Sequence, residues 1–252
     1  MSSLVITLTA CLILLFAGAG VASACCRGGS GTARRLLWLG WGGGCALLVA
    51  NALLAQAPPF GNMRHVLCFF PLVLVPAWYY LRRVRGVELG GYFAWAAALA
   101  RVGAMCMPLQ AGWRQMPALQ SPWFVPHVTS YVVSYGLLTV AALLALRSYA
   151  GEAPARLEAA DAVVRLAFPF LTFGLWSGAL WADAAWGRYW AWDIKEVWSL
   201  ITWGIYIIYF HLDAARPGWR RGLLLVGFAA VVITFLVVNL LPKIESLHSY
   251  AS

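Results

Sequence analysis

LVITLTACLILLFAGAGVASA, at residues 4–24, is a continuous apolar stretch near the start of a 252-residue chain. It contains no charged side chain, and about 20 such residues in a helix cross the hydrocarbon core of a bilayer. No basic residue precedes it, whereas Arg27, Arg34 and Arg35 follow it, which is the reverse of the order in a cleaved secretory signal. The stretch is therefore predicted to be a membrane span with the N-terminus outside.

The rest of the chain has the same character. Hydrophobic residues make up 62% of the chain and charged residues 11%, with a mean hydropathy of +0.76, whereas soluble proteins are about 45–50% apolar. Seven more apolar stretches follow, at residues 36–56, 65–81, 89–109, 127–146, 166–185, 197–214 and 222–241. We therefore predict an all-α fold, a polytopic transmembrane bundle of about eight spans. It would form one integral membrane domain over residues 1–252, with both termini on the outer (periplasmic) side.

The basic residues support this topology. Twelve of the 18 Lys and Arg residues fall in the four loops expected on the inner side, at residues 27–35, 82–85, 147–165 and 216–221, and five fall outside. This bias follows the positive-inside rule, and the longest inner loop, 147–165, is expected to be a connector. The net charge of +9 is then explained by topology and by the anionic lipids of the bilayer, so nucleic acid is not expected as a partner.

Two outer segments carry most of the unusual composition. Residues 110–126, QAGWRQMPALQSPWFVP, form an external loop before His127, and residues 186–203, WGRYWAWDIKEVWSLITW, hold five tryptophans among charged residues. An aromatic belt at the membrane interface explains two or three tryptophans per helix end, whereas a flat apolar surface for a planar ligand would use all five. Arg188 and Lys195 would pair with carboxylates of such a ligand, or with Asp193 and Glu196.

The expected start of the helix in this segment bears on how its rings are displayed. If Trp192 is already helical, then Trp192, Glu196, Ser199 and Trp203 lie near one stripe of the helix surface. Trp186 and Trp190 would then precede the helix in a short interfacial segment.

The four histidines separate by depth. His127 and His248 are both expected outside, where two imidazoles converging on an aromatic surface would suit a bis-histidine haem; unrelated interfacial histidines are the alternative. His211 lies about 22 Å deeper if the chain is helical from Glu196. It would serve a second site, with its opposite ligand from another chain, or have no special role. His65, at the expected outer end of the third span, is a poor partner for His211. No C-x-x-C-H is present, so no covalently attached haem of the chain's own is expected.

Three segments resemble one known family. WGRYWAWDIKEVWSLITWGIYIIYFH, at residues 186–211, is similar to the tryptophan-rich WWD signature of the haem-handling family of cytochrome c maturation, in its CcsA/ResC branch. SPWFVPHVTSYVVSYG around His127 and LHSYA around His248 resemble the two external histidine segments of that family. The pattern usually has proline after the WD, where this chain has Ile194.

The resemblance implies a set of site residues. His127 and His248 would be the axial ligands of an external haem, and His211 would be the ligand of a transmembrane haem. The residues of the haem-binding signature would be Trp186, Gly187, Trp190, Trp192 and Asp193.

The resemblance also implies a function, which is cytochrome c biogenesis in the bacterial cytoplasmic (inner) membrane. With a CcsB/ResB-type membrane subunit, such a protein moves haem b across the membrane and presents it for thioether attachment to the C-x-x-C-H of apocytochrome c. It would thus be one component of a holocytochrome c synthase. Two alternatives remain open: CcmC-type haem delivery to a chaperone without ligation, and a HemX-like, non-enzymatic membrane regulator of haem biosynthesis.

Overall fold

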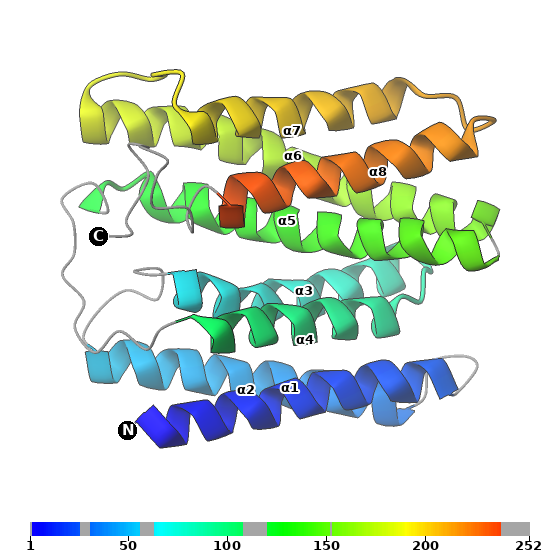
Figure 1. Ribbon diagram of the computed structural model, residues 1–252. Coiled ribbons are helices and arrows are strands. Elements are labelled where there is room, and N and C mark those ends of the chain that lie inside the picture. Colours follow the sequence, from blue (N-terminus) through cyan, green and yellow to red (C-terminus); the bar gives the residue numbers. More distant parts are fainter. Residues whose placement is uncertain (1, 26–30, 56–62, 108–119, 152, 238–252) are drawn as a thin grey trace. The chain divides into compact units, whose positions relative to one another are not determined.

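The computed structural model describes residues 2–25, 31–55, 63–107, 120–151 and 153–237 (Figure 1). These residues form eight α-helices and no β-strand. The helices are α1 (Ser2–Cys25), α2 (Gly31–Ala55), α3 (Met63–Arg85), α4 (Gly90–Cys106), α5 (Phe124–Arg147), α6 (Ala153–Trp186), α7 (Ile194–His211) and α8 (Pro217–Val232). A 3₁₀ turn (Ser148–Ala150) follows α5, and a π-helical turn (Ile233–Val237) continues α8. The prediction of an all-α fold is confirmed.

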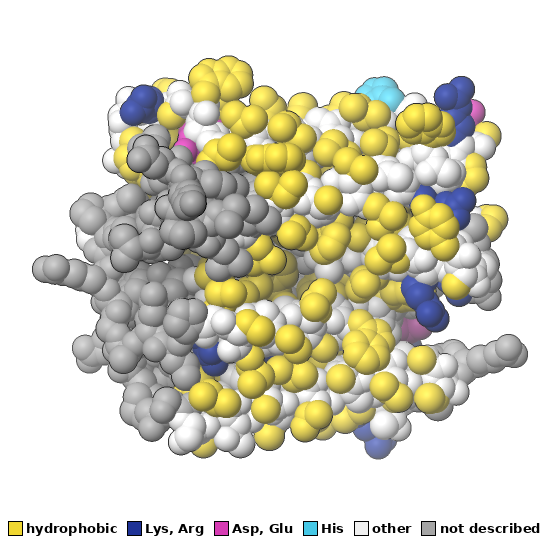
Figure 2. Space-filling view, in the orientation of Figure 1, with side chains coloured by type: hydrophobic (Ala, Val, Ile, Leu, Met, Phe, Trp, Pro, Cys, Tyr) yellow, Lys and Arg dark blue, Asp and Glu magenta, His cyan; other side chains and the backbone are white. Residues whose placement is uncertain are grey.

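Six of the helices are long and apolar enough to cross a membrane: α1, α2, α3, α5, α6 and α8 with its π-helical turn. Figure 2 shows apolar side chains over the middle of the helices and basic side chains mainly toward their ends, as expected for an integral membrane protein. The 17-residue α4 and the 18-residue α7 are outside this set. The number of crossings and the side on which the termini lie therefore stay predictions.

The chain divides into two compact units, Met1–Met116 and Pro117–Ser252. In the first, α1 packs on α2 and α4, and α3 packs on α4 and α2. Its buried Arg64 closes the end of α4, donating from Nη1 to the carbonyl oxygens of Ala104 (2.9 Å) and Met107 (3.2 Å). The cationic side chain thereby satisfies acceptors that a helix end leaves open.

In the second unit, α5 and α6 form the most extensive pair, and α7 and α8 pack on each other and on that pair. Successive helices run in opposite directions, so the start of α5, the end of α6 and the start of α7 meet at one end of the unit (Figure 1). This end, defined by His127, Trp186 and Asp193, is called the signature end below. The other end carries the arginines of the expected inner loops.

One predicted connector is wrong in extent. Helix α6 begins at Ala153, 13 residues before the apolar stretch at 166–185, so most of residues 147–165 is helical. The segment APARLEAADAVVR is rich in good helix formers, and Arg165 Nε contacts Asp161 Oδ2 four residues earlier at 2.7 Å. The break is confined to the region of Gly151, whose φ of 122° favours glycine.

Candidate functional site

The tryptophan-rich segment contains the loop of residues 187–193, which joins α6 to α7. Trp186 is the last residue of α6, and Gly187 follows it with a φ of 73°. The N–H of Gly187 donates to the backbone carbonyl oxygen of Asp183 at 2.8 Å. This left-handed residue after a helix is a common C-cap and costs little only for glycine. The position of Gly187 in the signature therefore has a conformational reason.

Helix α7 begins with a capping box. Asp193 is the N-cap, with its side chain accepting from the backbone at the helix start, while the Glu196 carboxylate reaches back to the backbone of the cap residue. Glu196 is buried, and its Oε2 accepts from the N–H of Ala191 (2.8 Å) and of Asp193 (3.1 Å). Asp193 and Glu196 thus fix the shape of the loop.

Ile194 is the first residue of the helix. Proline is favoured at this position because its fixed φ suits the helix and its missing N–H is not needed there. The capping box forms with isoleucine, so the departure from the family pattern leaves the helix start in place.

The expectation that Trp192 is helical is wrong. Its φ is 58°, and α7 begins two residues later, so Trp192, Glu196, Ser199 and Trp203 do not form one helical stripe. A bulky residue rarely adopts this conformation, and such strain gathers at functional sites. Trp192 is 71% exposed, and its ring meets the Trp190 ring edge-on, with centroids 5.9 Å apart. The loop therefore displays an apolar ring that the fold itself does not bury.

His127 lies in the first turn of α5 and is held from α6. Its Nδ1 is 2.9 Å from the carbonyl oxygen of Gly174, so the N–H on Nδ1 donates to that oxygen. In the neutral ring this hydrogen bond places the lone pair on Nε2, the arrangement usual in metal-binding histidines. The ring stacks on Trp181 (centroids 5.3 Å apart, 27° between planes) and meets Tyr131 edge-on at 4.9 Å.

Two glycines of α6 let His127 approach so closely. A Cβ on Gly178 would lie 2.7 Å from both Cε1 and Nδ1 of the imidazole, closer than real Cβ contacts. A Cβ on Gly174 would press on the Tyr131 ring at 3.2 Å. Glycines four residues apart on one helix face permit close helix packing, and here they seat the histidine.

Trp181 connects His127 to the signature. It contacts Trp186 with ring centroids 5.0 Å apart while stacking on His127. The structure thus brings His127 and Trp186 into one aromatic cluster. Gly174, Gly178 and Trp181 were not predicted as site residues from the sequence, although the glycine spacing in GLWSGALW at residues 174–181 was a usable signal.

Lys195 adds a titratable cation at the signature end. Burial lowers the pKa of its ammonium group to about 8, while the neighbouring Asp193 carboxylate raises it in part. Arg188 in the loop is exposed. Among the described residues, the signature end therefore includes the cationic Arg188 and a lysine whose charge changes at mildly alkaline pH.

The remaining histidines lie elsewhere. His211 is the exposed last residue of α7, with Nδ1 2.8 Å from the Ile207 oxygen, and the 18-residue helix places it about 25 Å from the signature end. His65 is in the first turn of α3 in the first unit. His248 and the loop 110–126, except for its last residues, lie outside the described residues. Among the residues described, no group of three or more His, Cys, Asp or Glu side chains is placed to hold a metal ion.

This arrangement defines a class: a polytopic helical membrane protein with an oriented histidine and a tryptophan-rich loop at one end of a four-helix unit. The family model for cytochrome c assembly protein matches residues 60–245, and the chain belongs to that family.

Its relatives belong to the CcsA branch. A cytochrome c biogenesis protein CcsA of Synechococcus elongatus is 33% identical over 271 residues, covering 81% of this chain and 82% of the relative. One from Synechocystis is 30% identical over 281 residues, covering 81% and 83%. One from Chlamydomonas reinhardtii is 40% identical over 152 residues, covering 54% and 42%.

Proposed function

We propose that this protein acts in cytochrome c biogenesis by holding haem b at the signature end, with the iron ligated by His127 and His248. The observation that carries the proposal is the seating of His127, whose Nδ1–H is fixed by Gly174 and whose ring is stacked on Trp181. The hydrogen bond sets the tautomer with its lone pair on Nε2, as an iron ligand requires, and the stacking restrains the orientation of the ring. The family match and the CcsA relatives support the same function.

The loop residues supply the rest of the proposed outer site. The exposed Trp192 ring and its neighbour Trp190 would lie against the porphyrin face or edge. Lys195 and Arg188 would attract the two haem propionates. Gly187, Asp193 and Glu196 would act on the haem through the loop, because their observed contacts determine its conformation.

The proposed reaction attaches this haem to apocytochrome c on the outer, periplasmic side of the cytoplasmic membrane. Each thiol of a C-x-x-C-H adds across one vinyl group: a C–S bond forms, and the thiol hydrogen is transferred to the other vinyl carbon. The protein's part is to hold the vinyls in place and exclude competing orientations. The C-x-x-C-H histidine would displace one of the two imidazoles, coupling attachment to release.

We further propose that His211 ligates haem at the other end of the same unit, before it reaches the outer site. His211 is exposed, and its Nδ1–H donates within its own helix, so the ring presents Nε2 away from the helix. A CcsB/ResB-type membrane subunit would supply the opposite ligand. This part explains why an oriented imidazole stands about 25 Å from the signature end.

The outer site is tested by absorption spectra of the purified protein, wild type against His127→Ala and His248→Ala. We expect each variant to lose the low-spin haem signal of the outer site and free imidazole to restore it. Unaltered spectra in both variants would remove the ligand pair. Synthase activity is tested by co-expression with the partner subunit and an apocytochrome. Haem delivered to a chaperone without thioether formation would instead support the CcmC-type alternative.

A further inference from the structure

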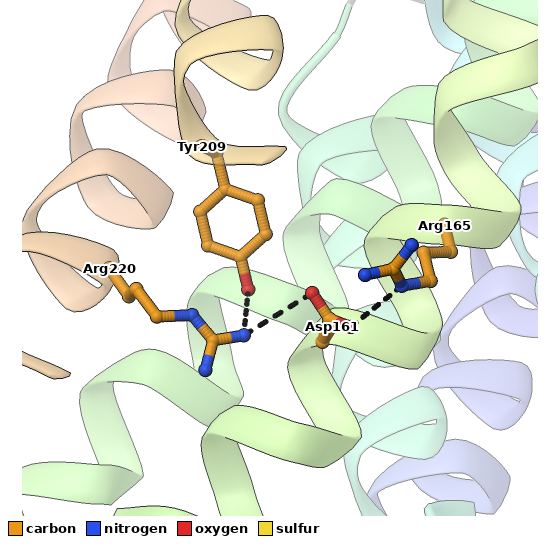
Figure 3. A network of polar contacts seen from close by, with 4 residues as sticks. All are labelled: Asp161, Arg165, Tyr209 and Arg220. Carbon is orange, nitrogen blue, oxygen red and sulfur yellow. Dashed lines mark hydrogen bonds and ion pairs between the residues drawn. The ribbon is translucent and has the colours of Figure 1, made fainter. Parts of the chain in front are cut away.

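The end of α7 opposite the signature end is held by a polar network that reaches three helices (Figure 3). Asp161 on α6 contacts two arginines, one through each carboxylate oxygen. Its Oδ2 is 2.7 Å from Arg165 Nε, and its Oδ1 is 3.2 Å from Arg220 Nη2 on α8. The same Arg220 nitrogen donates to the hydroxyl of Tyr209 on α7 at 3.1 Å.

Both residues just before His211 are clamped by this network. The Arg220 guanidinium lies over the Tyr209 ring, 5.4 Å from its centroid, and Tyr209 is only 2% exposed. The Arg165 guanidinium lies over the Phe210 ring at 5.6 Å, and Phe168 of α6 meets that ring edge-on at 5.1 Å. Asp161 orients both arginines, so a single carboxylate governs how Tyr209 and Phe210 are held.

Such a clamp matters because a helix end is otherwise loose. The last turn of α7 has carbonyls without partners inside the helix, and terminal turns fray. The exposed His211 ring contributes little packing of its own. The Arg220 side chain is only 13% exposed and that of Asp161 24%. Their ion pair is therefore screened less by water and salt than a pair on the surface would be.

We propose that Asp161, Arg220 and Tyr209 are positioning residues that fix the direction of the His211 imidazole toward the inner haem. This inference rests on the proposed role of His211 as a haem ligand. Their observed contacts are with protein groups at the end of α7, so they would act on the haem through His211. They act by preventing the last turn of α7 from unwinding, which would swing the imidazole away from the iron.

The test uses the full chain co-purified with its membrane partner, with haem as the probe. The variants are Asp161→Asn, Tyr209→Phe and His211→Ala, with Tyr149→Phe as the matched control. The guanidinium group of Arg221 on α8 lies over the Tyr149 ring, 4.6 Å from the ring centroid, and Tyr149 is 63% exposed. Each phenylalanine substitution removes only a hydroxyl group, so Tyr209→Phe keeps the buried ring and tests the hydrogen bond even if Asp161→Asn folds poorly.

The readout is the ratio of six-coordinate low-spin to five-coordinate high-spin iron at the inner site, by absorption and electron paramagnetic resonance. The inner signal is defined as the one lost in His211→Ala. We expect this ratio to fall about tenfold in Asp161→Asn, equivalent to about 1.4 kcal/mol, and about threefold in Tyr209→Phe, as for one hydrogen bond. Tyr149→Phe should keep the wild-type ratio.

The outcomes separate this inference from the proposed function. If His211→Ala abolishes the inner signal while Asp161→Asn and Tyr209→Phe keep the wild-type ratio, the positioning role is wrong and the ligand role of His211 stands. If His211→Ala leaves every haem signal unchanged, the proposed inner site fails, and the positioning role fails with it. An equal fall in Tyr149→Phe and Tyr209→Phe would also overturn the positioning role, because the effect would not depend on the clamp.

Discussion

Replacing Gly178 by alanine should move His127 without removing it. The added Cβ would lie 2.7 Å from Cε1 and Nδ1 of the imidazole, whereas carbon atoms in contact are normally about 3.5–4.0 Å apart. The ring must therefore retreat by about 1 Å. The bond from Nδ1 to the Gly174 oxygen, now 2.9 Å, would then exceed the range of a hydrogen bond.

The cost should fall on haem binding more than on folding. A lost hydrogen bond removes about 0.5–1.5 kcal/mol, but alanine in a helix interior recovers about 0.8–1 kcal/mol relative to glycine. The displaced imidazole meets the iron at a wrong angle, so we expect the dissociation constant of the outer haem to rise at least about tenfold. The assay is a haem titration followed through the low-spin absorption bands, with thermal unfolding measured in parallel.

Gly204→Ala on α7 is the matched control, because a Cβ there meets no atom within 4 Å. It should raise the melting temperature slightly and leave the haem affinity unchanged. Wild-type affinity in Gly178→Ala, in protein as stable as the control, would refute the claim that this contact orients a haem ligand.

Three further predictions concern the loop and the helix that follows it. Trp192→Gly should keep or increase thermal stability, since glycine removes a left-handed strain of about 1–2 kcal/mol. It should nevertheless weaken haem binding as much as Trp192→Ala does. A loss of stability with unchanged haem affinity would show that Trp192 is not strained and that its exposed ring does not bind haem. Gly187→Ala should lower stability by about 1 kcal/mol because of its positive φ, and equal stability would show that this cap is not needed. Because the pKa of Lys195 is lowered to about 8, its charge is present below that pH and lost above it, so haem affinity should fall about fivefold as pH rises from 7 to 9. The Lys195→Arg variant should stay charged and lose this pH dependence. If the variant keeps the pH dependence, another group is responsible for it.

The helices were predictable because length and hydropathy decide them in a membrane protein. In the described residues, each apolar stretch coincides largely with one helix, since a chain in lipid must satisfy its backbone internally. Hydropathy failed at the start of α6, where residues 153–165 are helical but carry charged side chains at Arg156, Glu158, Asp161 and Arg165. A helix that continues past the apolar layer looks like a loop on that scale, and only the helix-forming residues of the segment indicated otherwise.

The sequence contained a better signal for where α7 begins than the ring spacing that placed Trp192 in the helix. An Asp followed three residues later by Glu, as at Asp193 and Glu196, resembles the capping box and indicates a helix start between them. The spacing of the rings matched a helical stripe by coincidence, since α7 begins at Ile194. By contrast, the seating of His127 depends on contacts with α6, 47 residues away in sequence for Gly174, and no local pattern states which helix face it meets.

The two ends of α7 are held by different polar devices, the capping box at Asp193 and the clamp at Tyr209. Under the proposed function, each device stands beside one haem position, about 25 Å from the other. One iron atom cannot be bound by His127 and His211 together at that separation, so under the proposed function one haem would occupy the two sites in sequence. Transfer then requires release of His211 before capture by His127. Helix α7 would then hold the loop of the outer site at its first turn and His211 at its last turn, while His127 is held separately by α6.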